Sequence, residues 1–310
     1  MCYKISNTKG IEMKEKILVF VLFIFLFVGC LPTLGNQQIT NNDINKLNKT
    51  ISIIDRFYLR DIPPLHLKNI KKKYFTKEDI NNDIKSVLEK LDKYSVFINT
   101  KDKKEILKKI KFKIINEKIL YMAIPTFYHN TAKNISHIVI ENKNIAKALI
   151  LDLRNNPGGL VSEAVKTVNL FVDKGDIVSI KQKSMNGTRT YRASSQTTIT
   201  DIPIVVLINK NTASSAEIVS GALKNLQRAT LVGSETFGKR TIQALIYITK
   251  DKKEAINLTI ARYFFPSKKR INNKIKPDIL LFDDSFKKEH IDSQMKYATK
   301  YLKSIFKEVY

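Results

Sequence analysis

Residues 203–243 constrain the fold more than any other stretch, because they place small hydroxyl residues where a strand turns into a helix. The run Pro203 to Ile208 is short, apolar and β-branched, which predicts a buried strand. The small residues 212–216 then lead into a helical apolar pattern that Glu217 opens. A serine at such a turn exposes its hydroxyl, and the free N–H groups of the helix start face developing negative charge. Serine and threonine are also the usual N-cap residues of helices, so the turn is either a nucleophile site or an ordinary cap.

A lysine in the second half of this stretch favours the first interpretation. Lys239 lies between Gly238 and the run Thr241 to Thr249, which predicts a strand. Lys239 and Gln243 are four residues apart and share a face in a strand or a helix. A neutral lysine can be the general base of a serine if its pKa falls from ~10.4 towards ~7–8. Burial or a hydrogen bond from Gln243 would lower it; the alternative is one more surface lysine in a lysine-rich chain.

Three segments together resemble one family of peptidases. TASSAEIVSGAL (212–223), RATLVGSETFGK (228–239) and Gln243 are similar to the carboxyl-terminal processing peptidases, also called tail-specific proteases. The resemblance implies a serine protease with a Ser-Lys dyad. It places the nucleophile on Ser214, the base on Lys239 and a glutamine that orients the base on Gln243, and the separation of Ser214 and Lys239 is also the family's.

A second motif, ALILDLRNNPGGL (148–160), reads as an apolar strand followed by a polar turn and paired glycines. Gly158 and Gly159 can bring bare backbone N–H groups close to a ligand, or they can form an ordinary turn and helix start. The resemblance implies that the amides of Gly158 and Ser215 hold the oxyanion. We interpret residues 154–156 (Arg-Asn-Asn) as loop scaffolding.

Strands alternate with helices from Ile119 onward, which predicts an α/β fold with a largely parallel sheet. The expected elements are strands at 119–124, 148–153, 177–182 and 203–208 and helices at 131–141 and 161–173. The resemblance, which covers 119–279 well and 42–98 less closely, implies a crotonase/Clp-protease-like core. We therefore expect a peptidase core over 119–282 and a C-terminal amphipathic helix over 283–310.

The first residues predict export. The unbroken apolar run 17–28 follows Lys16 and is too short to span a bilayer, but it suits the core of a signal peptide. The run ends in Gly29-Cys30, which resembles a lipoprotein signal, so residues 1–30 would be the signal with Cys30 as the lipidated residue. Residues 31–42 have the composition of a tether. This predicts a membrane-anchored protein on the periplasmic or cell-surface side; a soluble secreted form and an uncleaved anchor are the alternatives.

Residues 43–118 are expected to form an N-terminal helical region. Apolar residues recur at the helical period in 44–57 and again in 80–91, and 101–118 reads as a short, lysine-rich helical segment. The family normally inserts a PDZ domain after these helices, a module that holds substrate tails in a sheet-edge groove. We expect none here, which puts the family's tail selection in doubt.

The charge balance raises the possibility of nucleic-acid binding. The chain has 54 Lys+Arg against 29 Asp+Glu, a formal net charge of +25. The lysines are spread along the whole chain and no aromatic-and-basic or zinc-finger signature is present, so we predict no nucleic-acid partner. An anionic membrane surface is a more natural neighbour for this charge.

Cysteine and histidine usage argues against other chemistries. The two cysteines, Cys2 and Cys30, precede the predicted folded region, and the four histidines are scattered without a metal-binding or triad spacing. We therefore predict no metal and no cofactor, and the shortage of histidine motifs favours a lysine base.

These observations predict an exported serine endopeptidase that acts on unfolded or C-terminal regions of protein or peptide substrates. Its predicted partners are those substrates and the membrane; its oligomeric state is left open. The alternative from another class is a catalytically silent surface lipoprotein that binds a protein partner through the same fold.

Overall fold

The computed structural model describes residues 40–59, 80–100, 109–183, 187–265, 274–282 and 292–309. The predicted signal segment, Cys30 and most of the tether lie outside these ranges. Among the helices within them, none combines the length and the apolar character that crossing a bilayer requires.

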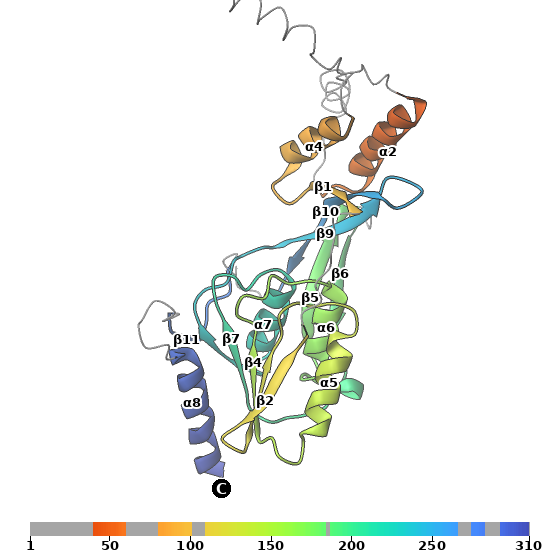
Figure 1. Ribbon diagram of the computed structural model, residues 1–310. Helices are drawn as coiled ribbons and strands as arrows, with labels where there is room; N and C mark the ends of the chain where they lie inside the picture. The colour runs from red at the N-terminus through yellow and green to blue at the C-terminus, as the bar shows by residue number, and fades with distance from the viewer. Residues whose placement is uncertain are drawn as a thin grey trace, which may run out of the picture.

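A six-stranded sheet forms the centre of the molecule (Figure 1). Its order is β11 (Ile279–Leu280), β8 (Thr230–Gly233), β7 (Ile204–Ile208), β4 (Ala148–Asp152), β3 (Ile119–Ala123) and β2 (Lys111–Ile115). Every neighbouring pair is parallel except β2–β3. All residues of β4 and β7 are buried, as expected for central parallel strands covered on both faces. The predicted α/β class with a mostly parallel sheet is confirmed.

Helices cover both faces of this sheet. The alternating side chains of β4 divide between two apolar clusters, with Leu149 and Leu151 in one and Ile150 in the other. The first cluster is closed by α5 (Thr131–Glu141), α6 (Val161–Asn169) and α7 (Ser215–Asn225). The second is closed by α8 (Ser293–Val309), which lies on the opposite face and inside the predicted C-terminal segment (Figure 1).

A second sheet, which the sequence analysis did not foresee, is antiparallel throughout. Its path is β1 (Val96–Asn99), β10 (Glu254–Phe264), β5 (Asp176–Gln182) and β6 (Gly187–Arg192), and β9 (Thr241–Tyr247) pairs with β10. The run 177–182 was expected in the parallel core and belongs to this sheet instead. Only Ile177 and Val178 of β5 are fully buried, which fits a strand with one covered face.

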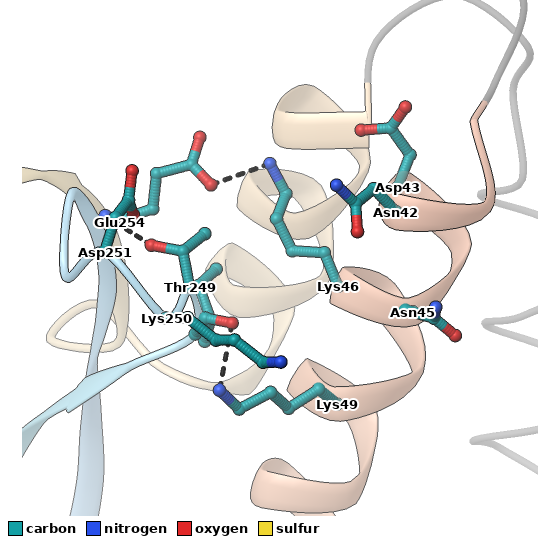
Figure 2. Close-up of a pocket in the computed structure, with 10 residues that line it drawn as sticks. Asn42, Asp43, Asn45, Lys46, Lys49, Thr249, Lys250, Asp251 and Glu254 are labelled. Carbon is teal, nitrogen blue, oxygen red and sulfur yellow. Dashed lines mark hydrogen bonds and ion pairs between the residues drawn. The ribbon is translucent and has the colours of Figure 1, made fainter.

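The N-terminal helices pack on the arm formed by β9 and β10. Helix α2 (Asn41–Phe57) begins with a capping box in which Thr40 and Asp43 exchange hydrogen bonds, and α4 is Ile80–Leu91. The apolar faces of both helices share a core with buried side chains of the arm: Ile248, Ile256 and Leu258. Figure 2 shows two lysines of α2 reaching the β9–β10 connection; Lys46 Nζ lies 2.8 Å from Glu254 Oε2 and Lys49 Nζ donates to Ile248 O at 3.1 Å.

The prediction of an all-helical region up to residue 118 is wrong in two places. Residues 111–115 form strand β2, paired in register with β3 from Lys111 opposite Ala123 to Ile115 opposite Ile119. Lysines in this stretch suggested a solvated helix, but the tertiary partner decides the conformation, because β3 offers an open edge. Residues 96–99 likewise form β1, and residues 101–108 lie outside the described part.

Candidate active site

Ser214 lies at the strained turn between β7 and α7. Its backbone has φ 54° and ψ −119°, a region that a residue with a Cβ adopts only where the surroundings enforce it, at about 1–3 kcal/mol. The Ser214 N–H donates to Glu217 Oε2 at 2.9 Å, and the Ser214 carbonyl accepts from the N–H of Glu217 and of Ile218. The side chain is partly exposed. Ser214 therefore combines the N-cap position with the strained turn expected of a nucleophile.

The neighbouring serine has a different environment. Ser215 is fully buried, and its Oγ donates to the carbonyl of Gly159 at 2.8 Å. Its hydroxyl is therefore committed to holding the glycine turn against the start of α7. Of the two serines, only Ser214 is accessible to a substrate.

The paired glycines lie directly beside this turn. A Cβ on Gly158 would be 2.7 Å from Ser214 Cβ, so only glycine allows the approach. The Gly158 N–H, however, donates to Asn156 Oδ1 at 2.8 Å and is already used. Within the described residues, the backbone N–H groups of Gly159 and Ser215 have no hydrogen-bond acceptor. In this structure the Gly158 N–H is thus occupied, whereas the N–H groups of Gly159 and Ser215 are available to an acceptor.

Residues 154–156 do form the scaffold of this turn. The Asn156 carbonyl accepts from Ala213 N, and the Asn155 Oδ1 accepts from the side chains of Asn209 and Asn211. Arg154 is more than loop scaffolding. It makes ion pairs at 2.6 Å with Asp152, at the end of β4, and at 2.8 Å with Asp292, just before α8, and so fastens the C-terminal helix to the core.

Lys239 lies in the loop between β8 and β9, residues 234–240. Its N–H donates to Glu217 Oε2 at 2.8 Å, and its side chain is half-buried. Burial lowers the pKa of the Lys239 amine, and the charges of Asp92 and Glu217 oppose this effect. The Nζ lies 4.7 Å from the centroid of the Tyr94 ring. In the described part of the chain, no hydrogen bond joins this Nζ to Ser214 Oγ.

Gln243 does not orient Lys239 in this structure. Its Nε2 donates at 3.0 Å to Thr241 Oγ1 and at 3.0 Å to Thr259 Oγ1. Thr259 Oγ1 in turn donates to Asp92 Oδ1 at 3.1 Å. Gln243 is therefore linked to the loop that follows α4. The four-residue spacing of Lys239 and Gln243 predicted a shared face, but Lys239 lies before β9, and the spacing carries no information about the threonines that bind the amide.

The sequence analysis missed the role of Glu217. This carboxylate is fully buried and accepts four hydrogen bonds, from the N–H groups of Ser214, Gly238 and Lys239 and from Thr236 Oγ1. Burial raises the pKa of the Glu217 carboxyl, and the four donors oppose this rise. The signal available in the sequence is the capping-box spacing of Ser214 and Glu217, which by itself predicts only a helix start.

Arg240 directly follows Lys239 in the chain. Its guanidinium lies 5.4 Å from the ring centroid of Tyr263 and 4.8 Å from that of Phe265. The cation therefore lies over one ring within β10, Tyr263, and one ring directly after it, Phe265. Within the described residues, no cluster of three or more His, Cys, Asp or Glu side chains could hold a metal ion.

A serine on a strained strand-to-helix turn of an α/β core, with unpaired amides beside it, defines the architecture of serine-dependent hydrolases. The sequence comparison agrees: residues 118–281 match the model of peptidase family S41. The match covers more than half of the chain, and the chain belongs to this family.

Two curated relatives carry names of the group that the motifs resemble. The chain is 34% identical over 181 residues to the carboxy-terminal-processing protease of Bartonella bacilliformis, a match covering 56% of the chain and 41% of the relative. It is 35% identical over 170 residues to the "Probable CtpA-like serine protease" of Staphylococcus aureus strain N315, covering 53% of the chain and 33% of the relative. The match thus spans less than half of each relative.

Solved structures share the fold at low sequence identity. The photosystem II D1 C-terminal processing protease superposes with a TM-score of 0.61 at 20% identity, covering 79% of this chain and 94% of that chain. A lipoprotein from Streptococcus agalactiae gives a TM-score of 0.65 at 19% identity, covering 86% and 97%. The resemblance to the carboxyl-terminal processing peptidases is confirmed for the family and the fold.

Proposed function

We propose that this protein is a serine endopeptidase that cleaves unfolded or C-terminal regions of protein substrates with Ser214 as nucleophile and Lys239 as general base. One observation supports it most: the Glu217 carboxylate accepts from the backbone N–H of both residues, at 2.9 Å and 2.8 Å. A single buried group thus joins the turn that carries the serine to the loop that carries the lysine. Family membership agrees with this assignment.

The reaction follows from these positions. Neutral Lys239 takes the proton of Ser214 Oγ as the oxygen attacks the peptide carbonyl. The N–H groups of Gly159 and Ser215 then stabilise the negative oxygen of the tetrahedral intermediate. Lys239 returns the proton to the leaving amine of the substrate. The neutral Lys239 amine then takes a proton from a water molecule, which attacks the acyl-enzyme carbonyl and releases the acyl group from Ser214. The partly buried position of Lys239 favours the neutral amine that this sequence needs.

The decisive experiment measures cleavage of casein and of unstructured peptides by the purified full chain. Wild-type protein should cleave, Ser214→Ala should not, and Ser304→Ala is the matched control because that serine is exposed on α8. Inactivity of the wild type on every unfolded substrate would favour the alternative, a silent surface protein that binds a partner. Cleavage by Ser214→Ala at the wild-type rate would remove the nucleophile assignment.

Substrate selection is tested with peptides that differ only in a free or amidated C-terminus. If no PDZ domain selects substrate tails, both forms should be cleaved at similar rates. A large loss on amidation would show that tail recognition resides elsewhere in the chain.

We further propose that the protein is exported and anchored through lipid on Cys30. The apolar run before Gly29-Cys30 supports this proposal. Cys30→Ala should move the protein from the membrane fraction to the soluble fraction, and Cys2→Ala, which removes the other cysteine, should not. A Cys30→Ala protein that stays in the membrane fraction would contradict lipid anchoring.

A further inference from the structure

The loop that leaves α4 reaches the candidate active site and has a fixed shape. Asp92 Oδ1 accepts from the N–H of Tyr94 at 2.8 Å and of Ser95 at 3.0 Å, and Asp92 Oδ2 accepts from Ser95 Oγ at 3.0 Å. These bonds close a turn in which one aspartate holds the residues two and three positions later. The backbone of Tyr94 is thereby held by the loop itself.

This loop is also tied to the strands next to Lys239. Thr259 of β10 donates its Oγ1 to Asp92 Oδ1 at 3.1 Å and its N–H to Ser95 Oγ at 3.2 Å. Gln243 of β9 donates to the same threonine. The chain of contacts therefore runs from β9 through Thr259 and Asp92 to Tyr94.

At the end of this chain of contacts, the Tyr94 ring contacts the side chain of Lys239. Lys239 Nζ lies 4.7 Å from the centroid of its ring, within the range of a cation–π interaction. Lys93 Nζ lies 5.1 Å from the same centroid and 5.8 Å from that of Phe237. An aromatic face attracts an ammonium ion and has no such attraction for a neutral amine. The contact therefore favours the protonated form of Lys239.

We propose that Tyr94 is a positioning residue that holds protonated Lys239 over its ring and away from Ser214. Loss of the proton removes the attraction, and the neutral amine turns towards Ser214 as the active base. Protonation and position of the base are thus coupled through a residue of the N-terminal region. This inference rests on the proposed role of Lys239 as the base.

Other charges around Lys239 act on the same equilibrium. Asp92 from the α4 loop and Glu217 from α7 favour the ammonium form; the other cations of this region are Lys93, whose Nζ contacts the same ring, and Arg240, the next residue in the chain. None of these groups is changed by substitution of the tyrosine. Tyr94→Phe keeps the aromatic face and Tyr94→Leu removes it, so the pair isolates the ring's contribution.

The contact is measured directly by NMR of the full chain labelled at the lysine ε-carbon. The Lys239 signal is assigned by its loss in Lys239→Arg. It should show a ring-current shift in wild type and Tyr94→Phe but not in Tyr94→Leu. The pKa of Lys239 should be lower in Tyr94→Leu than in Tyr94→Phe by about 0.4 to 1.5, which is the usual strength of a cation–π contact expressed as a pKa change.

The matched control is Tyr247→Leu. This ring lies 5.9 Å from Lys252 Nζ at the opposite end of β9, so its removal should leave the Lys239 signal and pKa unchanged. A wild-type Lys239 signal without a ring-current shift would overturn the proposal. So would equal Lys239 pKa values in Tyr94→Leu and Tyr94→Phe.

The activity measurement tests the coupling to chemistry. The acid limb of the kcat/KM profile should move to lower pH in Tyr94→Leu by the same amount as the Lys239 pKa, and Tyr94→Phe should match wild type. An unmoved limb despite a changed Lys239 pKa would overturn the coupling. If no variant cleaves any substrate, the proposed function fails, whereas the NMR titration still decides whether Tyr94 holds Lys239.

Discussion

The two halves of the candidate site hold their principal side chains in different ways. Ser214 is positioned by backbone: it joins the fully buried β7 to the largely buried α7, and its N–H and carbonyl are held by hydrogen bonds to Glu217 and Ile218. Lys239 is positioned by its surroundings: it is half-buried and precedes β9, whose residues are only partly covered. Its amine rests on a ring from a distant part of the chain.

This difference matches the roles proposed for the two residues, a nucleophile and a general base. A nucleophile that must meet a carbonyl at one place benefits from a rigid turn, because a small misplacement costs a large factor in rate. A general base must change its protonation state. Lys239, the proposed base, is only half-buried, and burial and the nearby carboxylates act on its pKa in opposite directions. Glu217 is the element common to both halves, since it accepts from the backbone of each. Substitutions should therefore abolish activity in the first half and change its pH dependence in the second.

The largest effect is expected from removal of the nucleophile. Ser214→Ala should lower kcat by about 10⁴-fold or more, and Ser214→Ala combined with Lys239→Ala should be no worse, because residues that act as a unit are not additive. The thermal stability of Ser214→Ala should be close to that of wild type, since its backbone contacts remain. Steady-state kinetics on an unstructured peptide and thermal unfolding measure both. Additive losses would contradict a dyad.

In the half of the site that holds Lys239, activity should depend on pH and on the residue at position 239. Activity requires the neutral amine, so wild-type kcat/KM should rise with pH through the pKa of Lys239, which burial holds below its usual value. Lys239→Arg should be inactive across this range, because a guanidinium stays protonated. The pH profiles of wild type, Lys239→Arg and the exposed-site control Lys250→Arg check this. An active Lys239→Arg would transfer the role of base to another group.

Substitution of Glu217, which accepts hydrogen bonds from both halves of the site, should have the next largest effect, on the free energy of unfolding. Glu217→Gln keeps the shape of the side chain but points an amide N–H₂ at backbone donors, leaving buried N–H groups unpaired. This should cost about 2–4 kcal/mol of unfolding free energy, because unmet buried donors and lost charged acceptors each cost about 1–3 kcal/mol. Chemical denaturation measures it. Thr236→Val removes one of the four donors and also the acceptor of the Ile275 N–H, so its cost reports both bonds and not that of Glu217 alone. An unchanged unfolding free energy in Glu217→Gln would contradict this role.

Local patterns in the sequence could predict the nucleophile half because its parts are contiguous. The strand, the small residues and the helix follow one another over Pro203 to Leu226, and the observed β7 and α7 differ from the expected bounds by one or two residues. The central α/β sheet was predicted for the same reason. Its parallel strands are continuous apolar runs, as in β4 and β7, and they need no information from distant residues.

The remaining features depend on partners that are far apart in the sequence. Nothing in residues 92–95 indicates that Tyr94 meets Lys239, and nothing near Gln243 indicates that Thr259 takes its amide. The contact between Gly158 N–H and Asn156 Oδ1 is different, because it joins residues only two apart, and the local pattern Asn156-Pro157-Gly158 could have indicated it. Strand β2 was missed because its pairing with β3 outweighs the polar composition of its lysine-rich segment.

The smallest expected effect concerns Ser215, whose hydroxyl holds the carbonyl of Gly159 at 2.8 Å. Ser215→Ala keeps the backbone N–H that the oxyanion needs but loosens the glycine whose N–H would be the second donor. A single hydrogen bond contributes about 0.5–1.5 kcal/mol, so kcat should fall by roughly 2-fold to 13-fold with little change in KM.

Ser220→Ala is the matched control for this substitution. Its buried hydroxyl donates to the Ala216 carbonyl at 2.9 Å within the same helix α7, so it reports any general loosening of that helix. Steady-state kinetics should therefore show a modest kcat decrease in Ser215→Ala and none in Ser220→Ala. A loss in Ser215→Ala as large as that in Ser214→Ala would instead make the Ser215 hydroxyl essential. The buried side chain would then have to leave Gly159 to act, and the rigid half of the site would be the one that moves.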